Sequence, residues 1–109
     1  MPTTYKVLGQ AKPTAATATT LYTVPSATQA VVSTLTVSSL TNDLTTIRVA
    51  IRPAGASLED KNYLVYNNTI PGYGTAQFTI GITLGAADVV TVYDTAGTCA
   101  FNLFGSEIS

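Results

Sequence analysis

The chain has 109 residues, which is enough for one domain with one core but not for two. It is 46% hydrophobic, which argues against disorder, yet only 10% charged, with a net charge of −1, one cysteine and no histidine. This composition excludes an internal disulfide, provides no basic patch for nucleic acid, and contains no apolar run long enough for a membrane span. We therefore expect one domain over residues 1–109 that binds neither nucleic acid nor membrane.

Turn signals divide the sequence into about eight short segments with the composition of β-strands. In chain order the expected strands are residues 4–8, 19–24, 28–40, 44–52, 62–67, 75–84, 89–93 and 98–104. Residues 10–20 contain Pro13 and lack an apolar stripe, so they are predicted to form an extended arm or loop. Residues 57–61 have room for a single helical turn, with Ser57 as its expected N-cap.

Alternation with a period of two is clearest in residues 44–52, where Ile47, Val49 and Ile51 share one face of the expected strand. No segment has the pattern of a helix of ten or more residues. The sequence therefore predicts an all-β fold, an antiparallel β-sandwich of the jelly-roll or immunoglobulin-like type. A closed barrel is the main rival architecture.

The residue types that carry most enzyme chemistry are scarce. Without histidine, a serine or cysteine nucleophile lacks its usual base, and Cys99 lies in an apolar strand as an expected buried, inert thiol. The carboxylates fall in predicted turns or at the tail, where capping side chains are expected. Zinc sites need several Cys and His residues. We predict a protein that is not an enzyme and holds no cofactor or metal.

Arginine and tyrosine side chains are the best candidates for recognition. Arg48 and Arg52 share one strand face, and two interpretations stay open for them: ion pairs with Glu59 or Asp60, or contacts with carboxylates on a neighbouring subunit. Tyrosine supplies amphipathic contact area that is enriched at interfaces. The predicted interface residues are Arg48, Arg52, Tyr63, Tyr66 and Tyr73.

Six segments together resemble a group of small structural proteins of tailed bacteriophages, especially marine ones, and they cover nearly the whole chain. The segments are YKVLGQ (5–10), LYTVP (21–25), RVAIRPAGA (48–56), KNYLVY (61–66), DVVTVY (88–93) and FNLFGSE (101–107). These are strand and turn patterns, and no functional residue is carried over with them. The resemblance implies a virion component, assembled in the host cytoplasm.

Among virion components, the low charge favours a capsid decoration (cement) protein, because a charge-poor surface costs little to desolvate against neighbours. Such a protein would clamp subunits of the major capsid protein, as a dimer or trimer, with residues 10–20 and the two tails as the expected reaching elements. A tail, neck or fibre-associated protein is the alternative. A carbohydrate-binding module on the virion surface is a third interpretation, with Tyr73 between two glycines as its best residue.

Overall fold

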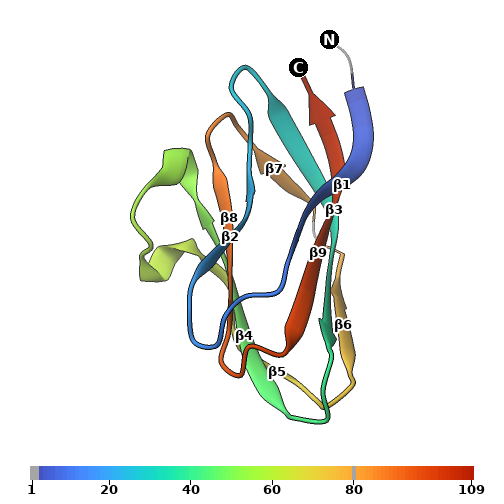
Figure 1. The fold of residues 1–109 in the computed structure, drawn as a ribbon. Coiled ribbons are helices and arrows are strands. Elements are labelled where there is room, and N and C mark those ends of the chain that lie inside the picture. Colours follow the sequence, from blue (N-terminus) through green and yellow to red (C-terminus); the bar gives the residue numbers. More distant parts are fainter. Residues whose placement is uncertain (1–2, 80) are drawn as a thin grey trace.

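The computed structural model describes residues 3–79 and 81–109, and these residues form two antiparallel sheets packed face to face (Figure 1). The strands are β1 (Thr3–Ala11), β2 (Thr19–Thr23), β3 (Gln29–Ser39), β4 (Thr45–Arg52), β5 (Tyr63–Ile70), β6 (Thr75–Phe78), β7 (Ile82–Leu84), β8 (Val89–Asp94) and β9 (Cys99–Ile108). The connection from β4 to β5 contains two 3₁₀ turns, η1 (Pro53–Gly55) and η2 (Asp60–Asn62). The predicted all-β sandwich is confirmed.

The strand order identifies the sandwich as a jelly roll. The first sheet has the order β1-β9-β3-β6, with β7 also paired to β3, and the second has the order β2-β8-β4-β5. If β6 and β7 are two halves of one strand, the chain pairs its first strand with its last, its second with the next to last, and so on inwards. This is one long antiparallel ladder wrapped into two sheets, as jelly rolls are built. The immunoglobulin-like alternative does not have this order.

The core lies between the two sheets and is built by the period-two alternation of the strands, which in β3 is shifted by one residue at a β-bulge between Val32 and Thr34. Val32, Leu35 and Val37 of β3 face Ile47 and Val49 of β4, and each of these side chains is at most 2% exposed. Phe101 in β9 is the largest of the fully buried side chains. Each such side chain contributes about 1.5–3 kcal/mol to folding through burial, which is the main source of stability in a chain without a disulfide.

Three local predictions were wrong. Residues 75–84 form two strands, β6 and β7, with Gly81 in the connection and residue 80 outside the described residues. The expected arm 10–20 is shorter, because Gln10 and Ala11 continue β1 and pair with the long β9. The helical turn lies at η2 and not at 57–61, because the Asn62 side chain accepts a hydrogen bond of 2.6 Å from the backbone N–H of Glu59, which replaces Ser57 as the cap.

The exposed strand edges are short or irregular. β6 and β7 have four and three residues, and β1, β2 and β5 each contain a β-bulge. Lys6 of β1 lies on the same face as buried Val32 and forms an ion pair of 3.0 Å with Glu107, which also accepts a hydrogen bond from the Tyr22 hydroxyl. Short edges, bulges and inward-facing charges all disfavour strand pairing between molecules. The faces and loops are therefore left as interaction surfaces.

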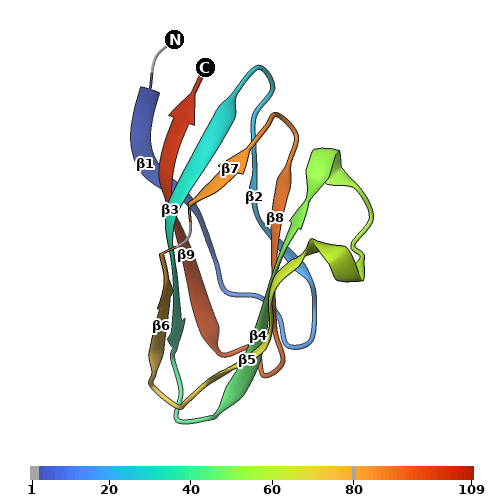
Figure 2. The same ribbon diagram turned by 180° about the vertical axis from the view of Figure 1, so that it is seen from behind.

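The start and the end of the described chain lie together at one end of the sandwich, and one long connection projects from its second sheet. β1 begins and β9 ends at the same end, as Figures 1 and 2 both show. Figure 2 also shows that the connection 53–62 stands out from the second sheet beside β8. Within residues 3–79 and 81–109, the structure has no helix that is long and apolar enough to cross a membrane.

Asp94 is a fully buried carboxylate at the corner where the chain passes from β8 to β9, and so from the second sheet to the first. It accepts hydrogen bonds from the Thr45 hydroxyl and from the backbone N–H groups of Ala96, Thr98 and Cys99. Burial alone would raise the pKa of Asp94, but these hydrogen bonds outweigh it and hold the pKa below its ordinary value. The corner is therefore built around an ionised carboxylate.

Replacing Asp94 with Asn should lower the free energy of unfolding by about 3 kcal/mol at pH 7, because the new amide group turns a donor toward backbone donors. Asp43→Asn, in an exposed turn, is the control and should change stability by less than about 0.5 kcal/mol. Urea unfolding measures both variants.

A comparison of the wild type with Asp94→Asn at several pH values tests whether Asp94 is ionised in the folded protein. A carboxylate whose folded pKa is depressed stabilises the fold above its unfolded pKa of about 4, and this stabilisation is lost as the pH falls through the lower folded pKa. The difference in stability between the wild type and Asp94→Asn should therefore shrink in acid. A difference that stays constant from pH 7 to pH 2 would contradict an ionised Asp94.

Candidate interaction site

The outer face of the second sheet carries an arginine held between two tyrosine rings. Arg48 of β4 and Tyr93 of β8 are paired across the two strands, and both point away from the core, since Ile47 and Val49 point into it. The Arg48 guanidinium carbon lies 4.6 Å from the centre of the Tyr93 ring and 4.4 Å from that of Tyr66. Both distances are typical of cation–π contacts.

A β-bulge in β5 brings Tyr66 to this position. Ile47 pairs with Asn68 and Val49 pairs with Val65, so two residues of β5, Tyr66 and Asn67, lie opposite Arg48. Asn67 has a φ of 54°, a left-handed conformation that asparagine tolerates better than most residues. Its side-chain oxygen accepts a hydrogen bond of 2.8 Å from Nε of Arg48. The bulge thus supplies one of the two rings that contact the guanidinium and the acceptor for its Nε.

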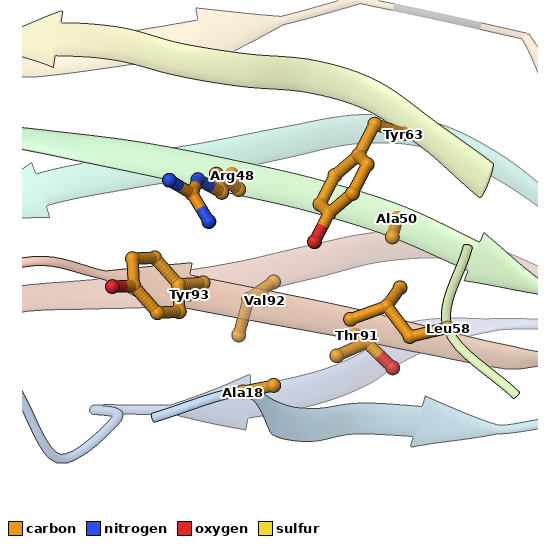
Figure 3. Close-up of a pocket in the computed structure, with 8 residues that line it drawn as sticks. All are labelled: Ala18, Arg48, Ala50, Leu58, Tyr63, Thr91, Val92 and Tyr93. Carbon is orange, nitrogen blue, oxygen red and sulfur yellow. The ribbon is translucent and has the colours of Figure 1, made fainter. Parts of the chain in front are cut away.

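A small pocket of about 210 Å³, which we call the Arg48 pocket, opens beside this guanidinium (Figure 3). Its lining residues are Ala18, Arg48, Ala50, Leu58, Tyr63, Thr91, Val92 and Tyr93. Ala50 and Thr91 are 1% and 4% exposed although both lie on the outer face of the sheet, so they form a covered floor. In Figure 3 the Tyr63 ring reaches from β5 over β4, with its hydroxyl directed toward β8. The ring of Tyr63 also makes an edge contact with Tyr66, with 4.9 Å between the centroids.

The connection 53–62 covers one end of the pocket, and Arg52 holds this connection in place. Arg52 donates hydrogen bonds to the carbonyl oxygens of Ala56, at 2.8 Å, and Gly55, at 3.3 Å. The carboxylate of Asp88 accepts a further hydrogen bond, of 2.9 Å, from the backbone of Ala54. Leu58 is thereby placed against the floor of the pocket, as Figure 3 shows.

The prediction that Arg48 or Arg52 forms an ion pair with Glu59 or Asp60 was wrong. In the described part of the chain the ion pairs are Lys6–Glu107 and Lys61–Glu59, and neither includes an arginine. The Glu59 carboxylate lies 3.3 Å from the Lys61 ammonium group. Arg48 donates to Asn67 in the bulge, and Arg52 donates to the backbone of its own connection. Contact of Arg48 with a carboxylate on a neighbour stays a prediction.

The structure brings together Arg48, Tyr63 and Tyr66 of the predicted interface residues and gives Arg52 a supporting role. Tyr73 lies apart: its backbone N–H donates to Thr41 in a different loop, and its side chain is 71% exposed. The five predicted interface residues did not include Tyr93, which was considered only among the tyrosines in general, or Leu58. The position of Tyr93 beside Arg48 depends on the register between β8 and β4, which the sequence does not give. Leu58 had a signal, since it is the one apolar residue in the charged segment 57–61.

The described lining of the Arg48 pocket offers hydrogen-bond donors and apolar surface to a bound group. It contains no carboxylate, imidazole or thiol. Elsewhere, burial first and the nearby Asp94 charge second raise the pKa of Cys99 to about 11, which keeps the thiol protonated. Within residues 3–79 and 81–109, no group of three His, Cys, Asp or Glu side chains is placed to hold a metal ion.

In comparisons with known proteins, no family model matches the chain and no curated protein matches it significantly. The resemblance to phage structural proteins therefore stays a prediction.

The stacking of Arg48 can be measured with a double-mutant cycle. Arg48→Met keeps an unbranched, flexible stem and removes the guanidinium with its charge, and Tyr66→Leu removes one ring. We expect the two changes to couple by about 0.5–1 kcal/mol in the free energy of unfolding, the value of an exposed cation–π contact. The control cycle combines Arg48→Met with Tyr73→Leu in the separate loop and should show no coupling. Equal coupling in both cycles would mean that the stacking contributes nothing specific.

Proposed function

We propose that this chain is a non-enzymatic structural protein of a tailed-bacteriophage virion that decorates the capsid and stabilises the shell of major capsid protein. The observation that supports this most directly is the Arg48 pocket with its flanking tyrosines on an otherwise charge-poor sheet face. Arginine and tyrosine in the middle of a packed face are the residues that most often dominate binding at protein interfaces.

The surface of the chain supports permanent packing against neighbours. With 10% charged residues, few ions must be stripped of water when a face is covered. The strand edges are blunted by bulges and short lengths, so contact through a face is favoured over contact through an edge. The jelly roll is also a fold of viral capsid and lectin domains, which supports the proposal by analogy of fold alone.

The proposed mechanism needs no chemistry. Each copy would bury about 800 Å² of its own surface, the usual area for a specific interface, against the shell or a neighbouring copy. Clustering as a dimer or trimer would add avidity, because the second contact then forms at a high effective concentration. Repeated over the shell, these contacts would resist the outward pressure of packaged DNA.

Copy number in purified particles tests this proposal. A decoration protein should be present at one copy for every one to three copies of the major capsid protein, as a symmetric shell lattice requires, within about a factor of two. Quantitative mass spectrometry of virions measures the ratio, with a known tail protein as the low-copy control. A ratio of a few per cent, similar to that of the tail protein, would overturn the decoration function in favour of a tail, neck or fibre component.

A further inference from the structure

We infer that the Arg48 pocket receives one glutamate or aspartate side chain from a protein partner, with the Arg48 guanidinium as the anchor. This inference names the chemistry of the partner at the proposed interface and in that sense rests on the proposed function. Its experiment, however, uses the isolated protein and a small probe, so the inference and the proposed function can fail independently.

The first argument is the unused donors of Arg48. A guanidinium has five N–H donors, and the hydrogen bond that the structure gives for Arg48 in the described residues uses the one on Nε, toward Asn67. The guanidinium carbon lies 4.4 and 4.6 Å from the centres of the two tyrosine rings, and in the described residues its terminal nitrogens make no hydrogen bond. The two terminal nitrogens are left in a fixed, planar fork. This fork matches a carboxylate in a bidentate geometry.

The second argument is charge. Neither ion pair of the described residues includes Arg48, and the residues opposite it in β8 and β5 are not acidic; they are Tyr93, Tyr66 and Asn67. A partly buried positive charge held between aromatic rings has lost part of its hydration, which strengthens its attraction for an incoming anion. Asp60 lines a separate open hollow with Tyr63 and Tyr66 and does not line the Arg48 pocket.

The third argument is the lining opposite the guanidinium. Leu58, Ala18 and Ala50 offer apolar surface for the methylene stem of an acidic side chain. The Tyr63 hydroxyl points across the pocket toward β8, where it can donate to a carboxylate oxygen (Figure 3). The pocket thus combines the guanidinium and a tyrosine hydroxyl with apolar walls, which together match the charged end and the methylene stem of a glutamate side chain.

Size decides between a protein side chain and a sugar. Pockets for small molecules usually measure about 300–1,000 Å³, and the Arg48 pocket measures about 210 Å³. This volume suits one side chain of an interface better than a sugar ring with its hydration. We therefore assign the pocket to a protein partner, with acidic sugars as a competing outcome of the test.

The probe is a blocked glutamate, N-acetyl-glutamate N-methylamide, and its matched control is the blocked glutamine of the same shape. Titration into the protein labelled with ¹⁵N and ¹³C should give saturable shifts at the Arg48 side-chain N–H and at the Tyr63 ring C–H groups. We expect a dissociation constant of about 1–100 mM, as for a single anchor without the rest of an interface. The blocked glutamine should bind at least about tenfold more weakly, since it lacks the charge-assisted hydrogen bonds.

Two pairs of variants locate the binding. Arg48→Met should abolish the saturable shifts, whereas Lys61→Gln, the same change of charge outside the pocket lining, should retain them. Arg48→Lys keeps the charge without the fork and should weaken binding by about fivefold or more. If Arg48→Met does not fold, Tyr63→Phe serves in its place, because it removes only a hydroxyl and should weaken binding several-fold.

Four outcomes would overturn the inference. Blocked glutamine could bind as well as blocked glutamate, or binding could survive the loss of Arg48. Glucuronate could saturate the same signals at a lower concentration than blocked glutamate, which would mark a sugar site. The same signals could shift on simple dilution without a probe, which would mean that a second copy of this chain occupies the pocket. A virion copy number typical of a tail protein would leave the pocket result unchanged.

Discussion

The corner around Asp94 is the constraint on which the two-sheet arrangement depends. Its carboxylate joins β4, through Thr45, to the turn that leads into β9. At this point the chain leaves one sheet and enters the other, so the direction of β9, and with it the pairing of β1 and β3, is set here. A buried charge is costly unless every lone pair finds a donor, and four donors meet that requirement.

Stability and interaction are divided between different parts of the molecule. The core between the sheets is apolar and carries the folding energy, since the chain has no disulfide and only two ion pairs in its described residues. The edges are closed to strand addition by bulges and short strands. What is left for contact is the outer faces of the two sheets and the loops, with Arg48 and its tyrosines gathered on the second sheet and exposed Tyr5, Val7 and Val31 on the first. A module of this kind can add contacts to an assembly without risking strand-mediated aggregation.

The site shows how an irregularity in a strand creates a function that regular pairing would not. In a regular ladder one residue of β5 would face Arg48; the bulge places Tyr66 and Asn67 there together, one for the face of the guanidinium and one for its edge. Arg52, four residues further along the same strand, is bound to its own loop and positions Leu58 instead. Two arginines with the same local pattern thus have different tasks.

The sequence by itself determined the all-β class, the sandwich and most strand positions, because alternation and turn residues act over a few neighbours. It also determined the burial of Cys99 and singled out Arg48, Tyr63 and Tyr66. Only the tertiary structure decided the jelly-roll order, the length of β1, and the meeting of Arg48 with Tyr93, because all three depend on pairing between segments far apart in the chain. The different surroundings of Arg48 and Arg52 were beyond sequence for the same reason: a bulge and a loop contact leave no period that a pattern can reveal.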